Sequence, residues 1–121
     1  MTGNSGCVIA ALFLTMTGAA ALAAGVPKIS LDIENGSRNM RTTAHYDCGG
    51  RTMDVDYINV EPNFLAMVPV DGKERIFVLV LSGSGARYAS GPYIWWSKGN
   101  AASLYDETKG ENAPPVLTCT E

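Results

Sequence analysis

Apolar and polar residues alternate along much of the chain after Lys28, in short runs separated by Gly, Asn, Asp and Pro. The alternation is cleanest in I-S-L-D-I-E and in M-D-V-D-Y-I-N-V. A period of two residues is typical of strands with one buried face, and no segment after Lys28 keeps a helical period. The predicted strands are Ile29–Glu34, Thr42–Cys48, Met53–Val60, Phe64–Val70, Arg75–Leu81, Tyr93–Ser97, Ala101–Tyr105 and Val116–Thr120.

Short strands at regular spacing predict an all-β domain, either a small antiparallel barrel or a sandwich. A barrel would remove the exposed sheet edges that a chain of 121 residues can hardly cover. The length is that of a single domain. Arg75–Leu81 is the most apolar run, and we expect it to be a fully buried central strand.

The first 24 residues have no charged side chain and contain an apolar run, Cys7–Thr17, that is too short to cross a bilayer. Small residues follow, and Ala21-Leu22-Ala23 matches an A-x-A cleavage site, with Leu22-Ala23-Ala24 close to it. We therefore predict a secretory signal peptide over 1–24 and a periplasmic or secreted domain over 25–121. Cys7 is the first residue of the apolar run, whereas a lipid-anchored cysteine would follow it, so we expect no membrane attachment after cleavage.

Cleavage would leave two cysteines, Cys48 and Cys119. In an oxidising compartment two cysteines predict one disulfide, with two free thiols as the alternative. The loop between them is long, so the chain-entropy contribution would be roughly 4 kcal/mol. The net charge of −3 argues against non-specific nucleic-acid binding and favours basic partners.

The stretch Ser82–Gly99 is unusually rich in glycine, aromatic residues and cations, and functional loops often have this composition. A strand at Arg87–Ala89, a turn at Ser90–Pro92 and the strand Tyr93–Ser97 would form an antiparallel hairpin centred on Gly91.

That centre sets Ser84 opposite Lys98, and Arg87 opposite Trp95 within reach of a cation–π contact. A hydroxyl and an ammonium side by side offer donors to an anion, most naturally a carboxylate. From composition alone, the alternative is a turn-capping serine and a solvated lysine.

Three motifs and a cysteine resemble the MliC/PliC family of bacterial inhibitors of c-type lysozyme. They are Y-D-C-G-G at Tyr46–Gly50, S-G-A-R-Y-A-S-G at Ser84–Gly91, W-W-S-K-G at Trp95–Gly99, and Cys119. The resemblance implies an eight-stranded antiparallel β-barrel with a disulfide and an inhibitor that performs no chemistry. Without an anchoring cysteine after the signal, the chain is similar to the periplasmic PliC-type branch.

The resemblance also implies that Ser84 and Lys98 enter the lysozyme cleft, with Tyr88 supporting the loop and Gly85 and Arg87 completing the lysozyme-binding set. Lysozyme keeps one catalytic carboxyl protonated and the other ionised. Lys98 would pair with the ionised group, and the Ser84 hydroxyl would hydrogen-bond to the acid. An acidic inhibitor would also be steered towards a strongly cationic lysozyme.

Two other functions fit parts of the sequence. A secreted barrel could bind glycan or lipid through Trp95-Trp96 or through its interior, although adjacent strand residues point to opposite faces, which favours one Trp in the core and one on the surface. A Ser84–Lys98 nucleophile and base pair would need a desolvated lysine, and this lysine lies among polar turn residues. We predict no enzymatic activity.

No metal or cofactor is predicted. His45 is the only histidine and is expected on a strand face. The two mature cysteines are far apart in sequence, which disfavours zinc. Asp54 and Asp56 share one strand face without a coordinating loop, as in a solvated surface rather than a calcium site. The sequence leaves open whether the protein is a monomer or a homodimer.

Overall fold

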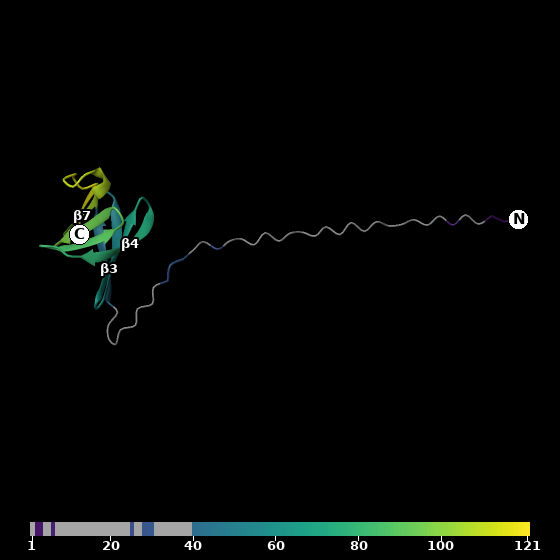
Figure 1. The fold of residues 1–121 in the computed structure, drawn as a ribbon, viewed down its shortest axis with the longest axis horizontal. Helices are drawn as coiled ribbons and strands as arrows, with labels where there is room; N and C mark the ends of the chain where they lie inside the picture. Colours follow the sequence, from purple (N-terminus) through teal and green to yellow (C-terminus); the bar gives the residue numbers. More distant parts are fainter. Residues whose placement is uncertain (1, 4–5, 7–24, 26–27, 31–39) are drawn as a thin grey trace. The chain divides into compact units, whose positions relative to one another are not determined.

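A computed structural model of the chain describes residues 2–3, 6, 25, 28–30 and 40–121. Residues 40–121 form a closed antiparallel barrel of eight strands (Figure 1). Its elements are β1 (Met40–Asp47), β2 (Thr52–Val60), β3 (Asn63–Val70), β4 (Lys73–Val80), β5 (Ala86–Ser90), β6 (Tyr93–Lys98), β7 (Ala101–Asp106), the 3-10 helix η1 (Glu107–Lys109) and β8 (Leu117–Thr120). The predicted all-β, eight-stranded antiparallel β-barrel is confirmed.

Two sequence predictions fall on residues that the structure does not describe. The signal peptide over 1–24 lies almost entirely outside the described residues, and so does most of the predicted strand Ile29–Glu34. The eighth strand of the barrel is instead β5, which extends the short strand expected at Arg87–Ala89. Within the described part of the chain, no helix is long and apolar enough to cross a membrane.

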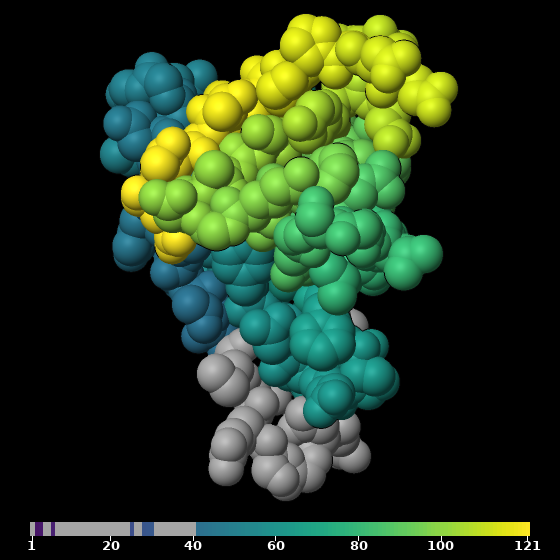
Figure 2. Space-filling view, turned by 90° about the vertical axis from the view of Figure 1, so that its left-hand side faces the viewer, coloured from purple at the N-terminus to yellow at the C-terminus, as the bar shows by residue number. Residues whose placement is uncertain are grey.

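The strands follow one another around the barrel in chain order, each antiparallel to the next. On the face in Figure 2, the yellow C-terminal residues lie beside the green residues of β6 and β7, which matches the β7–β8 pairing. The barrel closes where β8 meets β1 through the single pair Asp47 and Thr120. In such an up-and-down order successive connections alternate between the two ends of the barrel, and this alternation decides which loops can meet.

The interior is filled by aromatic and branched side chains that project inward from alternate strand positions. Trp95 and Phe77 have no exposed area. The Trp95 indole Nε1 donates a hydrogen bond to the Tyr57 hydroxyl at 2.8 Å, and the Tyr46 hydroxyl lies 2.9 Å from the same oxygen. The polar tips of three large residues therefore satisfy one another inside the core, as buried polar groups must.

β4 is not the fully buried strand that its sequence predicts. Phe77 points inward, but the side chain of Val78 is 51% exposed and that of Leu81, just after the strand, is 95% exposed. The interior of a small barrel accepts only every second residue of a strand, so a continuous apolar run must place half of its side chains outside.

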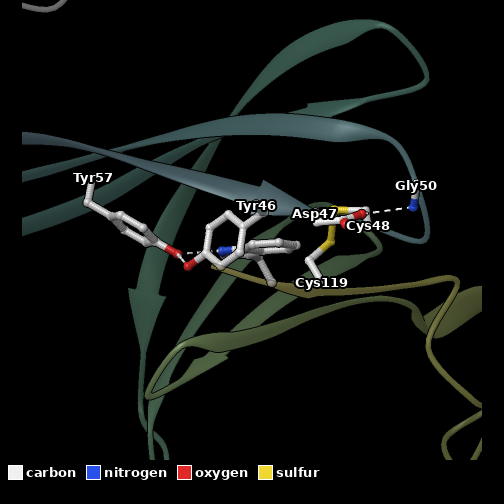
Figure 3. The surroundings of a disulfide bond; sticks show 7 residues. Tyr46, Asp47, Cys48, Gly50, Tyr57 and Cys119 are labelled. Atoms are coloured by element: carbon white, nitrogen blue, oxygen red, sulfur yellow. Dashed lines mark hydrogen bonds between the residues drawn. A yellow bond between two sulfur atoms is a disulfide. The ribbon is translucent and has the colours of Figure 1, made fainter.

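The disulfide joins Cys48, just after β1, to Cys119 in β8 (Figure 3). Both cysteines are buried. The turn after β1 is held in addition by a hydrogen bond from the Gly50 amide to the Asp47 carboxylate at 2.8 Å. The predicted disulfide is confirmed, and it fastens the seam at which β1 and β8 share one residue pair.

Candidate functional site

The β4–β5 loop (81–85) and the β6–β7 turn (99–100) lie at the same end of the barrel. Each follows an even-numbered strand, and in an antiparallel barrel such connections share one end. Ser84 lies in the first connection, and Lys98 is the last residue before the second. Topology alone therefore brings together the two residues that the sequence singles out.

The register of the β5–β6 hairpin differs by one residue from the predicted one. Ser90 pairs with Tyr93, so the turn contains two residues, Gly91 and Pro92, instead of being centred on Gly91 alone. Gly91 has φ +56°, in the left-handed region that glycine enters most easily. With this register Tyr88 and Trp95 are paired and both point into the barrel, whereas a shift of one residue would turn one of them outward.

As a result, Arg87 faces Trp96, and the predicted pairing of Arg87 with Trp95 is wrong. Ser84 is not directly opposite Lys98 either. The last pair of the hairpin is Ala86 with Ser97, and the next step along the same register sets Gly85 against Lys98. Ser84 lies one residue further out in the loop.

Gly85 allows the loop to pass very close to β6. Its φ is +63°, and a Cβ atom added there would lie 2.4 Å from the Ser97 carbonyl oxygen and 2.6 Å from Cγ of Lys98. No side chain fits into that space. The residue beside Ser84 thus contacts both the backbone and the side chain of the strand that carries Lys98.

Tyr88 is buried inside the barrel, with 6% of its surface exposed. Its ring lies 5.7 Å from that of Tyr57, and burial raises the pKa of its hydroxyl. Its burial agrees with a supporting role for Tyr88 and not with direct contact to a partner.

Arg87 projects from the outer face of β5. Its guanidinium donates to the Glu107 carboxylate at 3.1 Å and lies 6.0 Å from the centre of the Trp96 ring. The charge of Arg87 is therefore compensated within the barrel.

Trp96 is the residue of this site that the sequence reasoning missed as a participant. Its indole Nε1 donates a hydrogen bond to the Ser84 carbonyl at 2.9 Å, and the Lys98 ammonium lies 4.2 Å from its ring centre. A signal was available, because residues two apart on a strand share a face, as Trp96 and Lys98 do. Trp95 is fully buried while Trp96 is only half-buried, which confirms that the pair divides between core and surface.

Two acidic residues on the outer face of β2 form side-chain hydrogen bonds with residues of β1. Asp56 accepts hydrogen bonds from Arg41 and Thr43, which lower its pKa. Asp54 lies 2.7 Å from Nδ1 of His45, and this hydrogen bond raises the pKa of the exposed imidazole. His45 lies on a strand face, as predicted. Among the described residues, no group of three or more His, Cys, Asp or Glu side chains is arranged to hold a metal.

The opposite end of the barrel carries a cavity of about 730 Å³. Its lining combines apolar side chains such as Met53, Tyr93 and Leu104 with charged ones such as Glu74 and Lys109. None of its lining residues belongs to the β4–β5 loop or the β6–β7 turn.

Comparison with known proteins decides the family. Residues 46–113 match the family described as the membrane-bound lysozyme-inhibitor of c-type lysozyme (MliC). The chain belongs to this family. The matched segment runs from β1 to the residues after η1 and includes both the β4–β5 loop and the β6–β7 turn.

Curated relatives of the MliC family support the assignment. A protein of Pseudomonas aeruginosa named membrane-bound lysozyme inhibitor of C-type lysozyme is 46% identical over 78 residues, which is 63% of this chain and 61% of that protein. A protein of Cupriavidus necator with the same name is 47% identical over 73 residues, 60% of this chain and 58% of that protein. The chain thus matches about three fifths of the length of these relatives.

A solved structure shares both sequence and fold with this MliC-family chain. The crystal structure of Pseudomonas aeruginosa MliC in complex with hen egg white lysozyme is 36% identical, with a TM-score of 0.64 over 81% of this chain and 99% of that one. The family resemblance seen in the sequence is confirmed.

Proposed function

We propose that this protein is an exported inhibitor of c-type lysozyme that blocks the enzyme's active-site cleft with the barrel end carrying Ser84 and Lys98. One observation carries the proposal: a relative 36% identical in sequence and similar in fold has been crystallised in complex with hen egg white lysozyme. The inhibitor performs no reaction of its own and acts by occupying the space that substrate needs.

The chemistry of the two side chains supports this role. A lysozyme cleft holds one ionised carboxylate and one protonated carboxyl. The Lys98 ammonium has donors only and suits the ionised group, whereas a serine hydroxyl can donate to or accept from the protonated one. Both residues lie in exposed loop or strand-end positions at one end of the barrel.

The remaining predicted contacts take different parts in this proposal. Tyr88 supports the loop from inside the barrel, and Gly85 lets the loop approach β6. Arg87, already paired with Glu107, contributes through the loop's framework and less through its charge.

Export through a signal peptide over 1–24 belongs to the proposal, because lysozyme acts on the cell wall. The curated relatives are named membrane-bound. In this chain Cys7 opens the apolar run, whereas a lipid-anchored cysteine would follow it, so we propose a periplasmic or secreted form without a lipid anchor. Mass spectrometry of the exported protein tests this: a lipid-modified cysteine at the new amino terminus would contradict it.

A turbidity assay tests the main proposal. Purified inhibitor is added to hen egg white lysozyme acting on bacterial cell walls, and the rate of clearing is followed. We expect clearing to slow in proportion to inhibitor until the two proteins are equimolar. The folded double variant Ser84→Ala/Lys98→Ala is the matched control and should inhibit much less. Unchanged clearing with the native protein in molar excess would refute the proposal.

The cavity at the opposite end favours a second candidate function, the binding of a small amphipathic glycan or lipid. Its volume of about 730 Å³ is within the range of small-molecule pockets, and its lining combines apolar with charged side chains. Tyr93 in the lining allows a fluorescence titration with a fatty acid or a chitin oligosaccharide. Saturable binding without any effect on lysozyme would favour this function over the first.

A further inference from the structure

Trp96 contacts groups from three parts of the candidate site at once. It lies on the outer face of β6, where its indole Nε1 donates to the Ser84 carbonyl at 2.9 Å. The Lys98 ammonium lies 4.2 Å from its ring centre, and the Arg87 guanidinium lies on the same ring at 6.0 Å. One side chain therefore links the β4–β5 loop to the end of β6.

The contact with Lys98 holds a cation without neutralising it. Two arginines of the barrel are paired with carboxylates, Arg41 with Asp56 and Arg87 with Glu107. Lys98 resembles Arg75 instead, whose guanidinium lies 4.9 Å from the centre of the Tyr93 ring. In the described part of the chain, no carboxylate lies within ion-pair distance of Lys98. An aromatic face attracts an ammonium through its quadrupole and carries no net charge. The ammonium thus stays available to an external carboxylate while its position is restricted.

The contact with Ser84 fixes the backbone and leaves the side chain free. The Ser84 carbonyl accepts from the indole of Trp96, and its amide donates to the Ser82 hydroxyl at 3.3 Å. Among the described residues, the Ser84 hydroxyl has no hydrogen-bond partner. Gly85 allows this approach, since a Cβ there would lie 3.2 Å from the indole nitrogen.

We propose that Trp96 is a positioning residue that preorganises the Ser84 hydroxyl and the Lys98 ammonium for the cleft of lysozyme. The inference rests on the proposed function. A long lysine side chain and a glycine-rich loop lose much conformational freedom on binding, and groups already restricted in the free protein lose less. Trp96 restricts the backbone that carries the Ser84 hydroxyl through its N–H, and it restricts the Lys98 ammonium through its ring face.

The two contacts of Trp96 can be removed separately. Trp96→Phe keeps an aromatic face but deletes the N–H, so the loop should lose its anchor and the dissociation constant for lysozyme should rise about fivefold, which corresponds to one net hydrogen bond. Trp96→Leu deletes both contacts and should weaken binding further. Thermal unfolding of each variant shows whether the barrel is intact.

A double-mutant cycle separates positioning from direct contact. If Trp96 acts through Ser84, Trp96→Phe should weaken lysozyme binding much less when Ser84→Ala has already removed the hydroxyl. The matched control combines Trp96→Phe with Lys73→Ala at the opposite end of the barrel, where the two effects should simply multiply. An equal penalty of Trp96→Phe in the native and the Ser84→Ala backgrounds would overturn the proposal.

Measurements on the free protein keep the inference independent of lysozyme. By NMR, the Trp96 indole N–H should exchange slowly, and the Lys98 ε-methylene should show an upfield ring-current shift that Trp96→Leu abolishes. The amides of residues 83–85 should exchange faster in Trp96→Phe. If these signatures appear while the native protein fails to slow lysozyme, the proposed function alone falls. An indole proton exchanging at the solvent rate, with loop amides unchanged in Trp96→Phe, would overturn the positioning role.

Discussion

Tyr88 on β5 stands directly opposite Trp95 on β6, and both side chains are buried inside the barrel. Tyr88 packs on Tyr57, and Trp95 packs edge-on against Tyr46 with ring centres 5.4 Å apart. A slip of one residue would turn Arg87 or Trp96 inward and expel one of these aromatics. The aromatic core thus fixes the register of the hairpin, and the register places Gly85 against Lys98.

The Tyr57 hydroxyl is the centre of this core, because it contacts both the Trp95 indole and the Tyr46 hydroxyl. Tyr57→Phe would leave the buried indole N–H without its acceptor. We expect the free energy of unfolding to fall by about 1–3 kcal/mol, measured by urea denaturation. Tyr105→Phe on the outer face of β7 is the control, and an equal effect of the two substitutions would contradict the interpretation.

The sequence predicts the fold well where period and turn chemistry agree. Short apolar or alternating runs between turn residues predict seven of the eight barrel strands, and the expected hairpin supplies β5; the count of cysteines after the expected cleavage predicts the disulfide. The sequence predicts burial less well. The apolar run of β4 predicts a fully buried strand, but Val78 points outward, because composition does not show which face of a strand is covered.

For the candidate site, the sequence predicts that Ser84 and Lys98 lie close together, but it does not predict their exact pairing. Up-and-down topology brings the Ser84 loop and Lys98 to one barrel end whatever the hairpin register. The exact pairing depended on whether the turn contains one residue or two, and Gly91-Pro92 is compatible with either. The role of Trp96 depends on that choice, since only the observed register places it opposite Arg87.

The disulfide should contribute much of the stability, since it closes a loop with a sequence separation of 71 residues. The double variant Cys48→Ala/Cys119→Ala removes it without leaving a free thiol. We expect the free energy of unfolding to fall by roughly 4 kcal/mol relative to the oxidised protein. Native protein unfolded in reductant should show a similar loss. A difference below about 1 kcal/mol would mean that the β1–β8 seam holds without the covalent link.

The pair of His45 and Asp54 should make stability depend weakly on pH. The hydrogen bond to Asp54 raises the pKa of His45 in the folded protein. Its contribution is therefore fully present below the unfolded pKa of about 6.5 and is lost as pH rises through the folded value. NMR titration should give a His45 pKa above that of the Asp54→Asn variant. Identical titration curves would show that the pair does not form in solution.

The Lys98 charge and the Ser84 hydroxyl should both contribute to the inhibition of lysozyme. Ser84→Ala and Lys98→Ala are each expected to weaken lysozyme binding by roughly 1–3 kcal/mol, the range for hydrogen bonds to charged or buried groups. Lys73→Ala changes the same charge at the opposite end of the barrel and should have little effect. Isothermal titration calorimetry measures all three. Equal losses for Lys98→Ala and Lys73→Ala would point to net charge alone.

Two glycines in one loop give the sharpest test of how the Ser84 loop is held. Gly85 has φ +63°, and a Cβ there would lie 2.4 Å from the Ser97 carbonyl oxygen, which belongs to the backbone and cannot move aside. Gly83, two residues earlier, has open space around an added Cβ. Gly85→Ala should therefore push the loop away from β6 and lower the free energy of unfolding by about 1 kcal/mol or more. The same variant should inhibit lysozyme less. Gly83→Ala should retain both. If the two variants inhibit equally well, close approach of the loop to β6 is not needed for binding, because the displaced loop would still present Ser84 beside Lys98.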